Sequence, residues 1–283
     1  MQTLADCIII KGVTINFRLF QPEHQPEKHV LLLSAPGIPL RFWYKTAKDL
    51  VKKNAECVVC EMPGFGSDTF CPNVPTTADE CALFIWGLLD ELDAGTPHKW
   101  ELMAQGMACS VIASMAMTQT DYTGSLVMID PILNSGLSAF LRLLNKIKAA
   151  EPLVRLWLTK RLGTEKGITD FLAKLYGKKP AALTLTEMQE LQRHICDNIP
   201  TFTAFLCNIG AGNYAELGEL FLPSMVIWGG KDAILGGSIP KELKQLLPHA
   251  EYHVLPEAGH TPQLTDGDKL NDFLRGWTEE YWQ

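Results

Sequence analysis

Short apolar runs alternate along this chain with amphipathic segments, and the alternation predicts a mostly parallel β-sheet flanked by helices on both faces. Residues 29–35 (HVLLLSA) form a continuous apolar run of the kind found in a central strand that is buried on both sides. Residues 5–21 resemble an opening antiparallel pair. Further strand patterns occur at residues 56–64, 99–105, 125–130, 224–230 and 250–256, and helical patterns at 40–53, 77–94, from 107 onward, and at 270–283. We therefore expect a doubly wound sheet of about eight strands.

Residues 132–220 interrupt this alternation. They carry helical periodicity with almost no strand pattern, so they predict a helical insertion between two strands of the sheet. An insertion at such a place usually covers a functional site. The expected organisation is a core formed by residues 1–131 and 221–283 and a helical cap formed by residues 132–220.

Composition and charge narrow the class of protein. The 283 residues are 47% hydrophobic and 20% charged, as in an ordinary globular protein with a substantial core. A net charge of -7 provides no basic stripe, so nucleic acid is not an expected partner. No window is apolar enough for a membrane span, and the first residues lack the pattern of a signal peptide. These features predict a cytoplasmic protein.

The cysteines do not predict a redox or metal centre. Eight cysteines are scattered along the chain, and the one C-x-x-C pair, Cys57 and Cys60, lies within a strand pattern. Side chains three positions apart on a strand point to opposite faces, so these two thiols should not meet. We expect neither a cofactor nor a bound metal.

Five short motifs follow one another in an order that resembles the α/β-hydrolase fold family, over nearly the whole chain. The motifs are HVLLLSAPGIPLRFW (29–43), VVCEMPGFGSD (58–68), MAQGMA (103–108), VIWGGKDAI (226–234) and PEAGHTP (256–262). In the family they correspond to the oxyanion strand and loop, an Asp-x-Pro-Gly segment, the nucleophile turn, the acid-bearing strand and the histidine loop. The resemblance implies the family's mostly parallel eight-stranded sheet, with the helical cap inserted before the acid-bearing strand.

The position of the nucleophile holds a glycine. The family pattern G-x-S-x-G places serine on a strained turn between a strand and a helix, with small residues on either side. Here the flanking residues are Ala104 and Ala108, and the apex is Gly106. Glycine accepts a positive φ angle without steric cost but supplies no hydroxyl group. The neighbours Cys109 and Ser110 are poor substitutes, because residues one helical turn further on normally pack against the sheet.

The other two positions of a catalytic triad are present. Asp232 follows a strand pattern in WGGKDAI, and His260 lies in the loop AGHTP after the last strand, in the chain order of this family. Separately they would read as a capping aspartate and a surface histidine, but together they predict an acid–histidine pair. Asp130, at the end of SLVMID, is a second candidate for the acid and matches the family pattern less well.

The oxyanion loop departs from the pattern. Ser34 and Ala35 stand where the family usually has His-Gly, as judged by the separation from Trp43, so the expected backbone donor would be Pro36. Proline has no N–H group to donate. We assign Ser34, Ala35, Pro36 and Trp43 to the oxyanion and substrate-binding region.

Other backbone donors could replace the missing one. In a shifted register Gly37 or Ile38 could donate, and the N–H group of Met107 lies at the start of the helix after the turn. Loss of one such donor typically costs about two to three orders of magnitude in rate, so the loop argues against ordinary ester hydrolysis.

Three functions remain open. The chain could be a serine ester or thioester hydrolase whose nucleophile is replaced by Gly106, whether engineered or residual. It could be a natural non-hydrolytic enzyme (a lyase, isomerase, cyclase or cofactor-free oxygenase) that uses His260 and Asp232 as a general base. It could also be a binding protein that retains the pocket without the reaction. We favour an enzyme, because an acid–histidine pair buried without a function is costly.

The expected ligand is a small apolar, aromatic or acyl molecule held between the cap and the edge of the sheet. We expect apolar residues of the cap to line this pocket, namely Phe140, Leu141, Leu144, Leu156 and Phe205.

Overall fold

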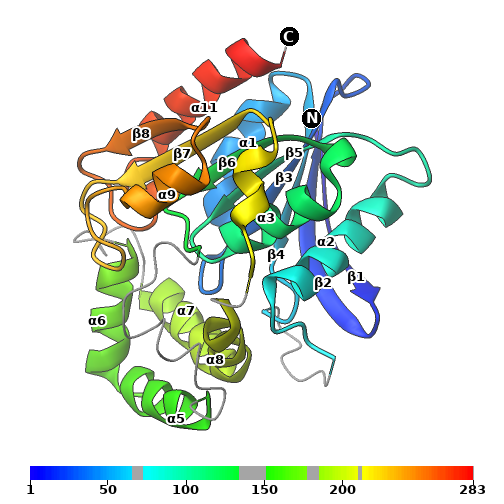
Figure 1. Cartoon of the computed structure of the whole chain (residues 1–283). Coiled ribbons are helices and arrows are strands. Elements are labelled where there is room, and N and C mark those ends of the chain that lie inside the picture. Colours follow the sequence, from blue (N-terminus) through cyan, green and yellow to red (C-terminus); the bar gives the residue numbers. More distant parts are fainter. Residues whose placement is uncertain (66–72, 134–150, 177–184, 210–211, 283) are drawn as a thin grey trace.

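The computed structural model describes residues 1–65, 73–133, 151–176, 185–209 and 212–282. A single sheet forms the centre of the molecule, with the strand order β1-β2-β4-β3-β5-β6-β7-β8 (Figure 1). Neighbouring strands from β4 through β8 are parallel, whereas β1 and β2 add an antiparallel pair at one edge. The strands are β1 (Gln2–Ile10), β2 (Val13–Gln21), β3 (Lys28–Ser34), β4 (Ala55–Glu61), β5 (Trp100–Gln105), β6 (Thr123–Ile129), β7 (Ser224–Gly229) and β8 (Glu251–Leu255). The predicted eight-stranded, mostly parallel architecture is confirmed.

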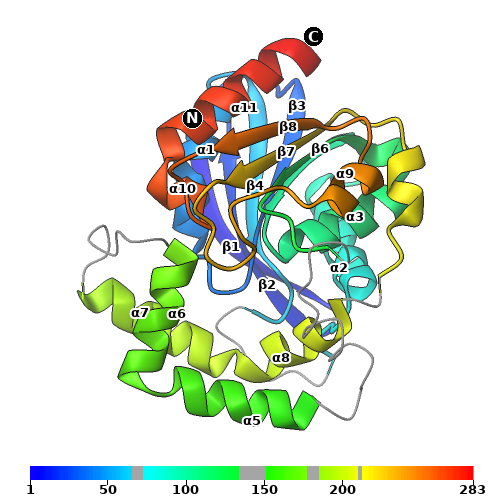
Figure 2. The same cartoon turned by 60° about the vertical axis from the view of Figure 1, so that its left-hand side comes forward.

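Helices cover both faces of the sheet. The flanking elements are η1 (Leu40–Trp43), α1 (Tyr44–Val51), α2 (Ala78–Leu92), α3 (Ala108–Thr118), η2 (Thr120–Tyr122), η7 (Ala215–Glu219), α9 (Lys241–Leu246), α10 (Pro262–Thr265) and α11 (Gly267–Tyr281). Helices α2 and α3 pack with one apolar cluster, and α1 and α11 pack with another on the opposite face. The rotated view shows α11 and α3 on either side of the sheet (Figure 2).

The continuous apolar run of β3 follows from its position at the centre of the sheet. Leu31 and Leu33 contact the cluster that contains α2 and α3, whereas Val30 and Leu32 contact the cluster that contains α1 and α11. All four side chains are fully buried. A strand covered on both faces therefore needs apolar residues at every position. The same alternation places Cys57 and Cys60 in opposite clusters, as predicted, and burial raises the pKa of both thiols.

Helix α2 begins at a complete capping box. The hydroxyl group of Thr77 accepts a hydrogen bond from the backbone N–H of Glu80, and the Glu80 side chain accepts one from the backbone N–H of Thr77. Together the two bonds satisfy N–H groups that have no partner within the helix. The acidic residues expected in the first turn, Asp79 and Glu80, lie there. Their negative charges stabilise the helix by interacting with the positive end of its dipole.

Thr77→Ala should lower the free energy of unfolding by about 1 kcal/mol, because alanine cannot accept the hydrogen bond from Glu80. Urea unfolding measures the change, and Thr96→Ala, at an exposed position outside the helix, is the control. Equal stability of the two variants would show that the capping box contributes nothing.

In the described part of the chain, helices α5 to α8 form a separate layer at one end of the sheet (Figures 1 and 2). These insertion helices are α5 (Glu151–Leu162), α6 (Glu165–Tyr176), α7 (Leu185–Asp197) and α8 (Ile199–Asn208). They fall within the segment 132–220 that the sequence assigns to a cap. The exact limits of that cap stay a prediction, since residues 134–150, 177–184 and 210–211 lie outside the described part of the chain.

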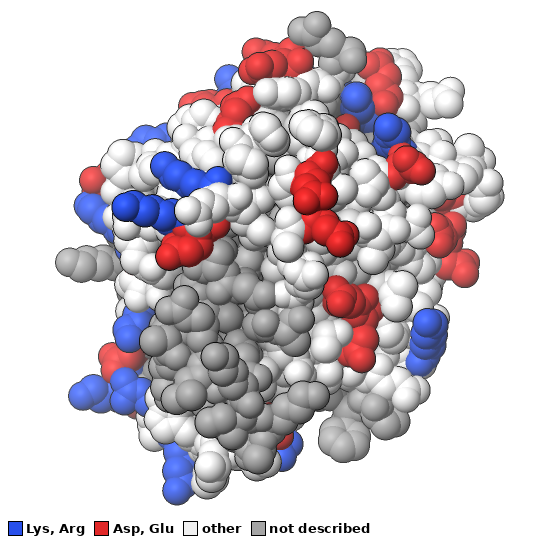
Figure 3. Space-filling model, viewed as in Figure 1, with Lys and Arg blue, Asp and Glu red and all other residues white. Residues whose placement is uncertain are grey.

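The surface is of mixed charge. On the face drawn in Figure 3, Lys and Arg side chains are interspersed with Asp and Glu, and the described residues there form no continuous basic area.

Among the described helices, none combines the length and the apolar character that crossing a bilayer requires.

Candidate active site

Gly106 occupies the turn between β5 and α3, at the carboxyl ends of the central strands. Its φ angle is +58°, in the left-handed region that glycine adopts without strain. The backbone N–H of Gly106 donates to the carbonyl of Ile129 at 2.8 Å, which fixes the turn against β6. A Cβ atom at this position would lie 3.2 Å from Nε2 of His260. The turn therefore directs any side chain at position 106 towards the histidine ring.

His260 and Asp232 form a buried hydrogen-bonded pair. Nδ1 of His260 lies 2.7 Å from Oδ2 of Asp232, and the two residues are 3% and 4% exposed. The other carboxylate oxygen of Asp232 accepts hydrogen bonds from the backbone N–H groups of Ile234 (2.6 Å) and Leu235 (2.9 Å). An ionised carboxylate only accepts hydrogen bonds, so Nδ1 carries the proton and Nε2 has its lone pair directed at the space beside Gly106.

Asp130 lies behind this pair and does not replace Asp232 as its acid. One oxygen of Asp130 accepts a hydrogen bond from the N–H of Gly229 at 2.8 Å, and the other, Oδ2, is buried without a partner among the described residues. Burial raises the pKa of Asp130 to about 7, with a smaller contribution from the nearby charge of Asp232, while His260 opposes the shift. Asp232 is therefore the acid bonded to His260, and Asp130 is a second buried carboxyl beside it.

Asp130→Asn should reduce the pH dependence of stability. The pKa of Asp130 rises from the ordinary 3.8 to about 7 in the folded chain, so the folded state binds this proton more tightly than the unfolded state. That stabilisation is fully present below about pH 4 and is lost as the pH rises through 7. Urea unfolding between pH 4 and pH 8 should show the variant gaining on the unmodified chain as the pH rises. Asparagine tolerates the φ angle of +44° at this position.

The surface residue Asp121, which is exposed, offers a matched Asp→Asn control. If both substitutions leave the same pH profile, Asp130 is ionised in the folded chain throughout this range, and the argument from burial is wrong.

These three residues also raise the question of a metal. Donor atoms of Asp130, Asp232 and His260 all lie within 4.8 Å of one another. However, both oxygens of Asp232 and Nδ1 of His260 are already used in hydrogen bonds. The set fits an acid–histidine pair better than a group of metal ligands, because ligands need free lone pairs directed at one point.

The oxyanion loop offers few backbone donors. Pro36 has no N–H group, and the N–H of Ile38 is used in a turn, where it donates to the carbonyl of Ala35 at 3.0 Å. Gly37, with a φ angle of +77°, and Met107, at the amino end of α3, are the donors that remain from the predicted set. Backbone N–H groups at the start of a helix have no intrahelical partner, which leaves Met107 able to face an oxygen of a ligand.

Two residues assigned to substrate binding have structural roles instead. The hydroxyl group of Ser34 donates to the carbonyl of Ile38 at 2.6 Å and so stabilises the loop. Trp43 is fully buried among residues of α1 and α11, in the cluster on the other face of the sheet. Neither lines the cavity described below. The spacing of Trp43 from the loop identified the motif correctly, but spacing alone does not determine the face on which a helix buries its tryptophan.

Neither Cys109 nor Ser110 can take over the role of the missing nucleophile. Cys109 is fully buried, with its thiol directed at the carbonyl of Ala104 (3.3 Å), and burial raises its pKa well above the ordinary value. Ser110 is also fully buried and donates to the carbonyl of Met107 at 2.7 Å. A nucleophile must be accessible and activated, and these two groups are neither.

A cavity of about 610 Å³ lies between the sheet and the insertion helices, next to His260. This volume lies within the range of pockets that bind small molecules. Most of its wall is apolar, and the charged residues are three side chains of α5 and α6. The lining residues are Ala35, Pro36, Ile38, Gln105, Met107, Ile132, Val154, Trp157, Leu158, Arg161, Leu162, Gly167, Asp170, Phe171, Lys174, Leu175, Phe202, Leu206, Ala233, Ile234, Leu235 and His260.

The predicted lining differs from the observed one. Leu156 is 52% exposed and Phe205 is fully buried, and neither borders the cavity. The residues that do so are a helical turn or less away, such as Trp157 and Phe202. Phe140, Leu141 and Leu144 lie outside the described residues. Helical periodicity indicates which segments are amphipathic, but which of their apolar residues face the cavity depends on tertiary packing.

Gln105 is a site residue that sequence analysis left unassigned. It is fully buried, borders the cavity, and donates through Nε2 to the backbone carbonyl of His260 at 2.6 Å. Its Oε1 has no partner among the described residues. The sequence signal that could have identified Gln105 is its position directly before Gly106, at the end of β5.

The insertion helices are hydrogen-bonded to both loops of the site. The hydroxyl group of Tyr176, at the end of α6, donates to the carbonyl of Gly37 at 2.7 Å. Thr261, which follows His260, donates through its hydroxyl group to the carbonyl of Leu175 at 2.7 Å. The carboxyl end of α6 thus joins the oxyanion loop to the histidine loop.

Comparisons with known proteins agree with this geometry. A family model described as the alpha/beta hydrolase fold matches residues 29–267. The chain is 29% identical over 213 residues to the dihydrolipoyllysine-residue acetyltransferase component of an acetoin cleaving system from Pseudomonas putida, covering 70% of this chain and half of that protein's length. It is 22% identical to a 2-hydroxy-6-oxononadienedioate/2-hydroxy-6-oxononatrienedioate hydrolase from Paraburkholderia phymatum, covering 87% of this chain and 85% of the relative.

The fold is also that of solved hydrolases. A thermophilic esterase from Thermogutta terrifontis superposes with a TM-score of 0.74 at 19% identity, covering 99% of each chain. The match of the family model over most of the sequence, together with the sheet order and the five motifs, shows that the chain belongs to the α/β-hydrolase fold family.

Proposed function

We propose that this chain is an enzyme in which His260, oriented by Asp232, acts as a general base on a small apolar or acyl-type molecule held in the cavity beneath a cap of insertion helices. The single observation that carries the proposal is the position of Nε2 of His260. His260 borders the cavity, and its Nε2 lies 3.2 Å from where a Cβ atom of residue 106 would be, yet residue 106 has no side chain. The base is therefore in place without a nucleophile to activate.

The local hydrogen bonds support the role of a base. Asp232 holds the proton of Nδ1, so Nε2 can accept a proton, and the carboxylate stabilises the imidazolium that results. Without a serine, the proton comes from the substrate itself or from a water molecule bound beside it. Nε2 then returns the proton to the product, so that the cycle balances without an external cofactor.

The missing donor in the oxyanion loop fits the same conclusion. A serine hydrolase stabilises a tetrahedral oxyanion with two backbone N–H groups, and here neither Pro36 nor Ile38 supplies one, which leaves Gly37 and Met107. Proton transfer to or from a bound substrate forms no tetrahedral oxyanion, so it does not need two donors in that arrangement. The apolar wall of the cavity favours an apolar or acyl substrate and makes proton transfer at Nε2 less dependent on bulk water.

A second function is favoured by one specific observation. The direction of the missing Cβ atom towards His260 is the geometry of a serine triad, so the chain is also consistent with a serine ester or thioester hydrolase whose nucleophile position has been replaced. The two functions differ in what a hydroxyl group at position 106 would do. If the chain instead only binds a ligand, no product forms, either from the unmodified chain or from variants at positions 106 and 260.

Mass spectrometry of the purified chain under native conditions tests the proposal. We expect a co-purified apolar or acyl molecule. Incubation with more of this molecule should give a product, either an isomer of it or fragments whose masses add up to its mass. Suitable first candidates for added substrate are 2-hydroxy-6-oxononadienedioate, from the name of one relative, and esters, from the description of the thermophilic esterase. A bound molecule that is always recovered unchanged would exclude the enzyme and leave the binding protein.

A further inference from the structure

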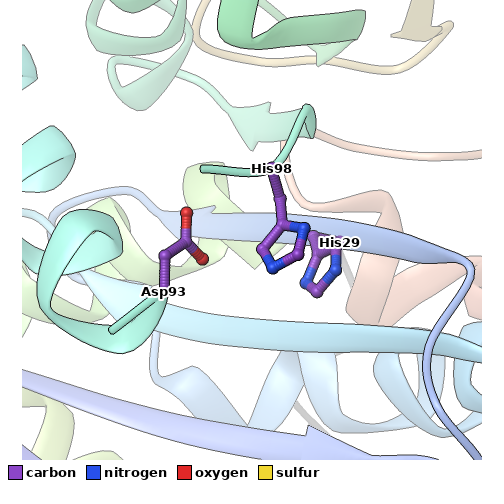
Figure 4. Close-up of side chains that lie close together, drawn as sticks. All are labelled: His29, Asp93 and His98. Carbon is purple, nitrogen blue, oxygen red and sulfur yellow. The ribbon is translucent and has the colours of Figure 1, made fainter. Parts of the chain in front are cut away.

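A cluster of two histidines and an aspartate lies at the amino ends of β3 and β5, whereas the cavity lies at the carboxyl ends of the strands. His29 lies near the start of β3, Asp93 follows the end of α2, and His98 precedes β5. One donor atom from each residue lies within 4.8 Å of the other two. Figure 4 shows the carboxylate of Asp93 directed towards the ring of His98, which lies against the ring of His29. The mechanism proposed above uses none of these residues.

Two of the three ligand candidates, His29 and Asp93, are oriented by a second residue. Nδ1 of His29 lies 3.3 Å from Oε1 of Glu56, which can only accept, so Nδ1 carries the proton and Nε2 keeps a free lone pair. The indole N–H of Trp100 donates to Oδ2 of Asp93 at 3.3 Å and leaves Oδ1 available. Histidine ligands of metals almost always donate their second nitrogen to a carboxylate or carbonyl in this way.

The orienting carboxylate is itself held in place, because the other oxygen of Glu56, Oε2, accepts a hydrogen bond from Nε2 of Gln21 at 2.9 Å. Neither ring nitrogen of His98 has a hydrogen-bond partner among the described residues, so its lone pair is free.

The cluster is accessible. A cavity of about 520 Å³ at this edge of the sheet is lined by His29 and His98, together with Lys28, Glu101 and Ser125. All three members of the cluster are partly exposed. An ion can reach them from solvent, and a water molecule can complete its coordination.

We propose that His29, Asp93 and His98 bind one divalent transition-metal ion, best suited to Zn²⁺, with water as a fourth ligand. Two imidazoles and a carboxylate are the donor types that Zn²⁺ accepts at about 2.0–2.2 Å. Tetrahedral donors at these distances are about 3.4 Å apart, so the three atoms must move closer together than 4.8 Å. The two rings, now stacked at 3.9 Å and 17°, must also turn so that both lone pairs meet at the ion.

Such a site would be structural. It would link the short connection between α2 and β5, which contains Asp93 and His98, to β3, which lies much earlier in the sequence. Because a metal that binds only the folded chain stabilises it by mass action, Zn²⁺ should raise the unfolding temperature without being needed for proton transfer at His260.

The test uses the full chain without a histidine tag, treated with a chelator and kept reduced. Added Zn²⁺ should bind at one ion per chain and raise the midpoint of thermal unfolding. His98→Gln should weaken binding at least tenfold and remove the thermal shift. His98 lies in a loop outside the strands, so its replacement should leave the fold intact, which circular dichroism checks.

His253→Gln is the matched control. His253 also lies next to a carboxylate, with Nε2 3.2 Å from Oε2 of Glu251, but it is not part of the cluster. This variant should bind Zn²⁺ as the unmodified chain does. Co²⁺ in place of Zn²⁺ should give visible d–d bands without a sulfur charge-transfer band, because the ligands are nitrogen and oxygen.

Three results would overturn the inference: no binding at one ion per chain, equal binding by His98→Gln and the unmodified chain, or a sulfur charge-transfer band that assigns the ion to cysteines. Each of these readouts is independent of activity, so failure here is distinguishable from failure of the proposed function.

Discussion

Replacing His260 with alanine should abolish turnover of the true substrate while leaving its binding nearly intact. A positioned general base contributes typically about two to four orders of magnitude to the rate, and Nε2 of His260 is the base that borders the cavity. Removing the ring leaves the apolar wall that holds the substrate in place. The measurement pairs a ligand titration with product detection, on the unmodified chain and on His260→Ala.

Two further variants make this result specific. Asp232→Asn should reduce turnover as well, because an amide can donate to Nδ1 and thereby favour the wrong tautomer of His260. His24→Ala, at an exposed histidine far along the chain from the site, should change nothing. Product formation that continues at the original rate in His260→Ala would disprove base catalysis by this residue. Tight binding without any product from the unmodified chain would identify a binding protein.

Gly106→Ser should give the chain the ability to be acylated by activated esters. The new Cβ atom would lie 3.2 Å from Nε2 of His260, so the hydroxyl group comes within reach of a base that is already oriented. The absence of a donor at Pro36 should slow both acylation and release of the acyl group, typically by about two to three orders of magnitude. Acylation should remain the faster of the two steps, because an activated ester has a good leaving group. Mass spectrometry detects the added acyl group, and absorbance detects the burst of released alcohol.

Gly106→Ala is the matched control for this experiment. Alanine brings the same Cβ atom and the same strain at a φ angle of +58°, but it has no hydroxyl group. Acylation by the serine variant alone would support a hydrolase whose nucleophile was replaced. A serine variant that is folded and still inert would instead favour chemistry that never used a nucleophile at this position.

The sequence predicted the sheet well because its strongest signals are local. The apolar run of β3 is a direct record of burial on both faces, and the order of motifs placed Asp232 and His260 on neighbouring loops. The capping residues of α2 could also be located from the sequence, since the bonds of Thr77 and Glu80 span only three positions.

The residues that sequence analysis missed depend on long-range packing. Trp43 and Phe205 are apolar in the right pattern, but the pattern does not determine whether such a side chain faces a ligand or the core. His29 and His98 are many residues apart along the chain. They come together only because β3 and β5 are neighbours in the sheet. Asp130 and Asp232, which the sequence offered as alternative acids, also lie side by side because β6 and β7 are neighbours.

The two hydrogen bonds at the end of α6 have a consequence for local opening of the folded chain. Tyr176 is bonded to the carbonyl of Gly37, and Thr261 to that of Leu175, so a movement that lifts this end of α6 breaks bonds to both loops of the site at once. The three segments should therefore behave as one cooperative unit in hydrogen exchange, with amides that lose protection together. A ligand that enters past Trp157 of α5, which borders the cavity and is 60% exposed, would leave this unit closed.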